Sequence, residues 1–259
     1  MLRFFRLIRQ RLLTENPPAG SRRADRFSKY LLYAIGEILL VVIGILIALQ
    51  VNNWNESRQE RSSELNFLSR IREDLRNDND YFKRRIDDAE HYVDYSKEFE
   101  EKLYEKQYTL DDVSELVELF SKFYKSEMMT IQNSTFSEML YAGKLELLTN
   151  EELKSLLLDY YRRSEEVAKH VTEFNVYSVD VFNIMHDKAP SILFAKEIIK
   201  KGLTFEEDYG YFNNPSSDKF QALAYAASLY GTKHQVFLDY FIELDSLSRD
   251  LINRLEALE

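Results

Sequence analysis

The feature that most constrains this chain is an apolar segment, residues 30–51, which reads YLLYAIGEILLVVIGILIALQV. As a helix it measures about 33 Å, enough to cross a hydrocarbon layer of about 30 Å. A core helix of a soluble protein is rarely apolar on every side over this length. A cleaved signal peptide has a shorter apolar run followed by a small-x-small pattern, and no such pattern follows here. We therefore predict one transmembrane helix.

Charge is distributed unevenly on the two sides of this segment. Residues 1–29 carry eight basic and two acidic side chains, whereas residues 52–259 carry 26 basic and 41 acidic ones. Basic flanks of a span stay in the cytoplasm, so we expect the N-terminus inside and residues 52–259 outside. Tyr30 and Trp54 are the aromatic anchors expected at the inner and outer interfaces. The net charge of −15 on the outer part argues against nucleic acid as a partner.

The basic tail, residues 1–29, contains the stretch RFFRLIRQRLL at residues 3–13, with its apolar side chains on one helical face. We predict an amphipathic helix on the inner leaflet, with a disordered basic tail as the alternative. The residues expected at the membrane surface are Arg3, Arg6, Arg9 and Arg11.

Glu37 is the one charged residue of the apolar segment and lies about 10 Å inside it. A carboxylate there costs on the order of 2.5 kcal/mol or more, which makes it a candidate functional residue. Tyr33, Glu37, Gly44 and Ala48 share one helical face, and Gly44 with Ala48 forms a small-xxx-small pair that lets a second helix approach. We favour a helix–helix contact. Ion handling with a partner subunit, or a protonated or snorkelling Glu37 without a specific role, are the alternatives.

The outer part, residues 52–259, shows helical periodicity and little turn punctuation, with no proline and one glycine between residues 52 and 189. We predict an all-α fold: one transmembrane helix plus an elongated antiparallel helical bundle with coiled-coil-like packing, in an up-down order of four main helices. Residues 187–217 are expected to be irregular. Apolar seams are predicted along three segments. They are Leu65, Leu68, Leu75, Phe82, Ile86, Ala89, Val93 and Leu103; Leu153, Leu157, Tyr160, Ser164, Val167, Val171, Phe174, Ser178, Val181 and Met185; and Leu223, Ala227, Tyr230, His234, Phe237, Phe241, Leu244, Ser248, Leu251, Leu255 and Leu258.

Capping patterns place the starts of three of these helices. Thr109 with Asp112 and Thr149 with Glu152 have the spacing of capping boxes. Ser217 or Asp218 is expected to begin the last helix. A helix from Thr109 is expected to continue to about residue 126.

No motif of a known catalytic site is present. The chain contains no cysteine, and it lacks a glycine-rich phosphate loop, a GxSxG elbow and an HExxH pair. The four histidines are scattered, and His234, on a seam, is expected to be a hydrogen-bonded core residue. We therefore expect no enzyme, no metal, no cofactor and no small-molecule substrate.

Three strings of the sequence resemble a known family. RFFRLIRQRLLTEN (residues 3–16), RFSKYLLYAIGEILLVVIGILIALQVNNWNE (26–56) and, more loosely, TFSEMLYAGKLELLTNEEL (135–153) are similar to an uncharacterised family of single-pass proteins from Bacteroidota, a domain of unknown function. The stretch PPAGSRRAD (17–25) departs from the family as an insertion. The resemblance implies a bacterial inner-membrane protein with a periplasmic helical domain, and it implies no activity.

These observations favour a membrane-anchored interaction or scaffold protein of the bacterial envelope that is not an enzyme. Its partners would be the lipid bilayer and either further copies of itself or another membrane protein, bound through the span and the bundle. The alternatives are a periplasmic sensor and an accessory subunit of an ion-driven envelope machine that uses Glu37.

Overall fold

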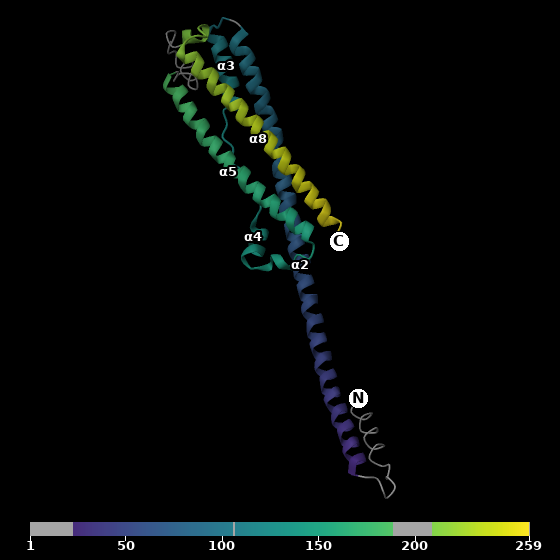
Figure 1. Ribbon diagram of the computed structural model, residues 1–259. Coiled ribbons are helices and arrows are strands. Elements are labelled where there is room, and N and C mark those ends of the chain that lie inside the picture. Colours follow the sequence, from purple (N-terminus) through teal and green to yellow (C-terminus); the bar gives the residue numbers. More distant parts are fainter. Residues whose placement is uncertain (1–22, 106, 189–208, 259) are drawn as a thin grey trace. The chain divides into compact units, whose positions relative to one another are not determined.

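A computed structural model describes residues 23–105, 107–188 and 209–258, and this part of the chain contains helices and no strand. The α-helices are α2 (Arg23–Glu105), α3 (Leu110–Phe123), α4 (Ser134–Tyr141), α5 (Glu151–Lys188) and α8 (Asp218–Glu256), as Figure 1 shows. Two short 3-10 helices, η1 (Lys144–Leu147) and η2 (Gly210–Asn213), complete the elements. Of the segment expected to be irregular, residues 187 and 188 belong to α5, residues 210–213 form η2, and residues 189–208 lie outside the described residues.

The chain divides into two units, Met1–Ser62 and Ser63–Glu259, and α2 contributes to both. In the first unit, α2 carries the apolar segment, and none of its most apolar window is buried. It is the one helix of the described residues that is long and apolar enough to cross a membrane. The predicted tail helix at residues 3–13 lies outside the described residues.

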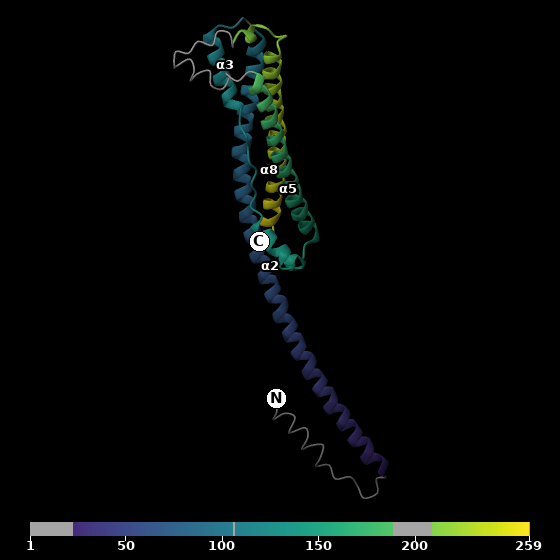
Figure 2. The same cartoon turned by 90° about the vertical axis from the view of Figure 1, so that its left-hand side faces the viewer.

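The second unit is built from three long helices: residues 63–105 of α2, together with α5 and α8 (Figures 1 and 2). Contacts between α2 and α8 run in opposite directions along the two helices, and so do those between α5 and α8. The pairs are Arg76–Glu256, Asn79–Asp245, Phe82–Phe241 and Tyr104–Phe220 for α2 with α8, and Glu152–Arg254, Arg163–Glu243, Phe174–Phe237 and Tyr177–Tyr225 for α5 with α8.

Helices α2 and α5 therefore run parallel to each other, as the first and third of four helices do in the expected up-down order. The helix that was expected to reach residue 126 ends at Phe123, and residues 124–133 are not helical. This segment, visible in both views as a thin trace between α3 and α4, returns the chain along the three helices. We call residues 124–133 the crossing segment.

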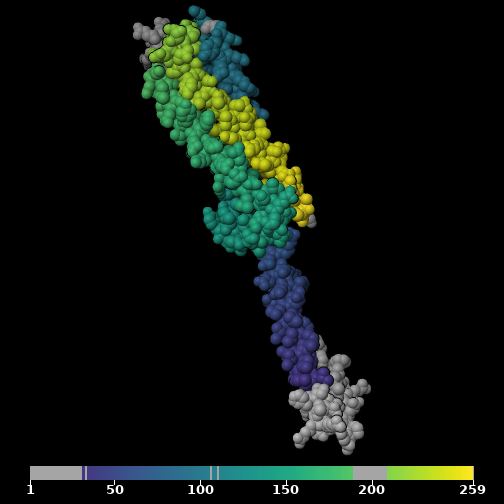
Figure 3. All heavy atoms as spheres, viewed as in Figure 1, coloured from purple at the N-terminus to yellow at the C-terminus, as the bar shows by residue number. Residues whose placement is uncertain are grey.

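The predicted seams form the core of the second unit. Nearly all of their members are buried, with Phe174 and Ile86 packed at its margin and Leu65 and Leu258 exposed at its end. The core has two clusters, one around α3 and η2 that includes Phe99, Phe120 and Phe220, and one that includes Leu157 and Phe241. Figure 3 shows α5 and α8 closing against each other along one face of this unit.

Two of the three predicted helix caps are confirmed. Thr109 and Asp112 form the expected capping box of α3, and the Ser217 hydroxyl accepts the amide of Phe220 at the start of α8. At α5 the expected Thr149 cap is wrong, because Asn150 Oδ1 accepts the amide of Leu153. The amide and hydroxyl of Thr149 instead donate to the buried carboxylate of Glu64, at 2.8 and 2.9 Å.

Candidate functional site

The predicted packing face of the first unit is open. Glu37, Gly44 and Ala48 are all exposed on α2. Apart from the adjoining residues and the backbone of the helix itself, no atom lies within 4 Å of the position that a Cβ of Gly44 would take. Trp54 is 64% exposed, and the guanidinium of Arg58 lies 6.0 Å from its ring centre. Such a face, with one carboxylate and two small residues, can receive a second helix at close range.

Four of the expected site residues, Arg3, Arg6, Arg9 and Arg11, lie outside the described residues. Tyr30 and Tyr33 belong to α2. The structure describes their backbone and not their side chains, so Tyr30 as an interface anchor and Tyr33 as part of the packing face stay predictions.

A second candidate site, which the sequence did not indicate, is the crossing segment. Side chains of the three long helices bond several of its backbone groups. Backbone bonds occur at its two ends, where the amides of Tyr124 and Lys125 donate to the carbonyls of Phe120 and Phe123 and the carbonyl of Asn133 accepts the amide of Ser137. Lys233 donates to the carbonyl of Lys125, Asn175 bonds both the amide and the carbonyl of Glu127, Tyr81 donates to the carbonyl of Met128 at 2.6 Å, and Asp78 accepts the amide of Gln132 at 2.7 Å.

Three ionisable side chains, Glu127, Lys233 and His234, lie buried where the crossing segment meets α8. We call them the charged cluster. The His234 ring places Nε2 2.7 Å from the carbonyl oxygen of Phe123 and Nδ1 3.1 Å from Oε1 of Glu127. The Lys233 ammonium lies 4.4 Å from the ring centre of Tyr230, and burial lowers the pKa of Lys233 to about 8. The prediction that His234 is a hydrogen-bonded core residue is confirmed.

Asp78 anchors the other end of the crossing segment. Its carboxylate accepts the amide of Gln132 and, at 2.8 Å, the hydroxyl of Tyr160. Burial raises the pKa of Asp78 to about 6, although both hydrogen bonds act to lower it. Burial likewise raises the pKa of Tyr160, so its hydroxyl stays a donor at any physiological pH.

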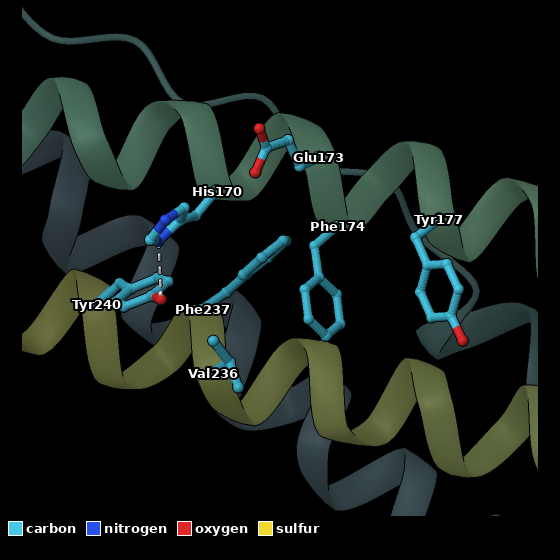
Figure 4. A pocket seen from close by; sticks show the side chains of 7 residues that line it. All are labelled: His170, Glu173, Phe174, Tyr177, Val236, Phe237 and Tyr240. Atoms are coloured by element: carbon cyan, nitrogen blue, oxygen red, sulfur yellow. Dashed lines mark hydrogen bonds between the residues drawn. The ribbon is translucent and has the colours of Figure 1, made fainter.

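An open groove of about 440 Å³ lies between α5 and α8, and we call it the aromatic groove. Figure 4 shows Phe174 and Tyr177 of α5 and Phe237 and Tyr240 of α8 around it, with His170 bonded to the Tyr240 hydroxyl at 3.2 Å. Glu173 and Val236 complete the lining, and Glu173 lies 3.8 Å from Lys169. Aromatic faces beside a carboxylate suit a cationic group.

The described residues hold no group of three or more histidine, cysteine, aspartate or glutamate side chains that could bind a metal ion. The sequence reasoning missed Lys233, Glu127 and Asp78. Lys233 directly precedes a seam position, and this was the one local signal that it faces inward.

Comparison with known proteins places part of the chain in a family. The sequence profile of a family of unknown function, DUF6090, matches residues 37–187. The matched residues include most of the apolar segment, the crossing segment and α5. No curated protein and no solved structure matches the chain.

Proposed function

The chain belongs to the DUF6090 family, whose function is unknown, and we propose that it is a membrane-anchored interaction protein of the bacterial envelope. In this proposal α2 crosses the inner membrane once, with the basic tail in the cytoplasm and residues 52–259 as a periplasmic helical bundle with coiled-coil-like packing. The span associates with a second copy, and the bundle docks a partner protein.

The observation that carries the proposal is the complete exposure of the apolar part of α2. A soluble monomer rarely exposes a contiguous apolar patch of more than a few hundred Å², whereas every described side chain from residue 34 to 51 is exposed. The bilayer accounts for most of this surface. The Glu37–Gly44–Ala48 face supports a helix partner, because a carboxylate in hydrocarbon is stabilised by a hydrogen-bonding partner and the small residues permit close contact.

The aromatic groove supports the docking of a partner by the bundle. Tyr240 already holds a cation against its ring, because the guanidinium carbon of Arg163 lies 5.4 Å from the ring centre. The exposed Glu173 and the net charge of −15 on residues 52–259 favour a basic partner. A lysine or arginine side chain is therefore the partner group that the groove fits best.

Native mass spectrometry of the full-length protein, extracted from its own membrane in mild detergent, tests the self-association. We expect a dimer or a higher oligomer for the wild type and a monomer for Gly44→Leu, because the added side chain separates the two helices. Leu46→Phe, on the opposite side of the helix, is the control and should leave the oligomer intact. A monomeric wild type, or an unchanged Gly44→Leu oligomer, would count against the packing face.

Two substitutions at Glu37 separate this proposal from ion handling. Gln keeps the hydrogen bonding and removes the charge, whereas Ala removes both. The interaction proposal expects Gln to preserve the oligomer and Ala to weaken it. Loss of cellular function with both variants, while the oligomer stays intact with both, would favour the accessory subunit of an ion-driven machine.

Co-purification after chemical cross-linking in cells tests the docking surface. A defined second protein should be captured by the wild type and lost with Tyr177→Ala, which removes one wall of the aromatic groove. Tyr141→Ala is the matched control, because Tyr141 is exposed and is not part of the groove lining. If both variants captured the second protein equally, the partner would bind outside the aromatic groove.

A further inference from the structure

We propose that the crossing segment is an acid-sensitive strap, held to the bundle by a single proton shared between Glu127 and His234 and released when a second proton enters the charged cluster. This inference concerns only the second unit. It does not depend on the membrane anchor or on the partner proposed above.

The way in which the crossing segment is bound makes it separable from the rest of the fold. Buried backbone groups are normally satisfied by other backbone groups in helices or sheets. Here side chains from α2, α5 and α8 bond the amides and carbonyls of four segment residues. Tyr124 and Asn133, at the two ends, keep backbone bonds to α3 and α4. The part of the segment between them can therefore leave the bundle without breaking the backbone hydrogen bonds of any helix.

Hydrogen-bond geometry places one proton between Glu127 and His234. The carbonyl of Phe123 can only accept, so Nε2 of His234 is the donor of that bond. Nδ1 faces Oε1 of Glu127 at 3.1 Å, and this contact needs a hydrogen on one of the two atoms. The pair is either imidazolium with carboxylate or imidazole with carboxylic acid, and its net charge is zero in both forms.

A second proton on the charged cluster would weaken the hydrogen bond between Glu127 and His234. The imidazolium N–H would then face a neutral carboxylic acid, and the bond would lose the charge assistance that strengthens it. The ammonium of Lys233 and the imidazolium of His234 would be buried next to each other, and Glu127, the carboxylate that acts on Lys233, would be neutral. Buried charges of one sign without a counter-charge are strongly unfavourable.

The described side chains around the charged cluster supply no free counter-charge for a second proton. From α2, the Tyr92 ring lies 4.8 Å from the His234 ring, and the nearby Arg85 and Asp88 are paired with each other at 2.5 Å. From α5 the neutral Asn175 faces the segment, and from α8 Tyr230 and Phe237 contact Lys233. The second oxygen of Glu127 is buried and has no hydrogen-bond partner among the described residues.

Asp78, on α2, is a further titratable group that bonds the crossing segment, and it acts in the opposite direction. Acid neutralises a buried carboxylate there, which favours the bound segment. The Asp78→Asn variant removes this contribution, because the amide is neutral at every pH and can still bond Gln132 and Tyr160. The response of the charged cluster is therefore measured most cleanly in the Asp78→Asn background.

Hydrogen exchange of the full-length protein in detergent, measured by mass spectrometry at pH 7.5 and pH 5 and corrected for intrinsic rates, tests the strap. Peptides that cover residues 124–133 should exchange at least tenfold faster at the lower pH, while α8 peptides change little. His91→Gln is the control, because His91 is exposed on α2, outside the cluster. It should keep the acid response.

Glu127→Gln is the decisive variant. A glutamine can donate its amide to a neutral imidazole, so the contact with His234 no longer needs a shared proton. An imidazolium beside the buried Lys233 ammonium is disfavoured in this variant, because no carboxylate is present to balance it. The exchange of this variant over residues 124–133 should be the same at both pH values. Both proteins are compared in the Asp78→Asn background. A protein with Glu127 and His234 intact that shows no acid response there, or a Glu127→Gln variant that opens as it does, would overturn the proposal.

A direct measurement covers the case in which Glu127→Gln does not fold. Histidine labelled with nitrogen-15 reports by NMR which ring nitrogens carry hydrogen, and loss of the signal in His234→Gln assigns His234. The proposal expects Nδ1 to carry or share a hydrogen at neutral pH and both ring nitrogens to carry hydrogen at pH 5. A ring with only one hydrogen-bearing nitrogen at pH 5 would contradict it.

Discussion

Asp78 and Lys233 are both removed from water by the fold, and burial shifts their pKa values in opposite directions. For each group burial penalises the charged form, so it raises the pKa of the acid to about 6 and lowers that of the base to about 8. Each shift makes the free energy of unfolding depend on pH over a defined range. Both residues bond the backbone of the crossing segment, so these ranges also describe how firmly that segment is held.

Asp78→Asn should make the protein more stable at pH 7.5 and leave it nearly unchanged at pH 4. The pKa of Asp78 is about 6 in the folded state against an ordinary value of 3.8. The native state therefore binds more protons between these values, and this contribution to stability is lost as the pH rises through 6. Urea unfolding at both pH values measures the difference, on the order of 2 to 3 kcal/mol for a shift of about two units. An equal change at both would refute it.

Lys233→Met should remove a rise in stability between pH 8 and pH 10.5. The pKa of Lys233 is about 8 in the folded state against an ordinary 10.5, so over this range the unfolded chain binds the extra proton. Stability from this group is present above 10.5 and is lost as the pH falls through 8. The wild-type unfolding free energy minus that of the variant, measured at pH 8 and at pH 10, should increase with pH. A constant difference would contradict the burial of a titrating ammonium.

At the scale of the helix, the seams decide which side chains stabilise the second unit. Leu157 and Leu158 are neighbours in α5, but Leu157 lies fully buried on the predicted seam whereas Leu158 is 39% exposed. They offer the same chemistry in two environments. The pair therefore tests whether the buried seam, rather than helix content, holds the helices together.

Leu157→Ala should lower the free energy of unfolding by about 2 to 5 kcal/mol, because it removes buried methyl groups and leaves a cavity. Leu158→Ala should change it by less than about 1 kcal/mol, because alanine is a good helix former and little burial is lost. Chemical denaturation of both variants measures this. Equal costs for the two would show that the assigned face of α5 is wrong.

The long helices were predictable because their stability comes from a local period that is written in the sequence. The alternation of three and four residues from Leu153 to Met185 identifies the buried face of α5 without knowledge of its partners. The crossing segment has no such period. Residues 124–133 are held by Asp78, Asn175 and Lys233, which are distant in sequence, so the course of this segment had no local signal. Asn150 replaced Thr149 as a cap for the same reason, because Glu64 binds Thr149 from α2.

At the scale of the whole molecule, the chain combines an apolar helix that nothing in the first unit covers with a second unit that has its own core. In the function that we propose, a bilayer covers the apolar helix and a second helix packs on its Glu37 face. The second unit folds around its own seams and presents an acidic surface with an aromatic groove. This division is what we expect of a protein whose function is to bring other molecules together at a membrane.

Cysteine cross-linking in native membranes tests this account most directly, because the chain has no cysteine of its own. Single cysteines placed from residue 40 to residue 51 should form disulfide-linked dimers with helical periodicity, strongest at residues 44 and 48 and weakest at 42 and 46. This result would show that the span is inserted and self-associates through the predicted face. Cross-linking that is absent at every position, or equal at all of them, would contradict self-association through that face.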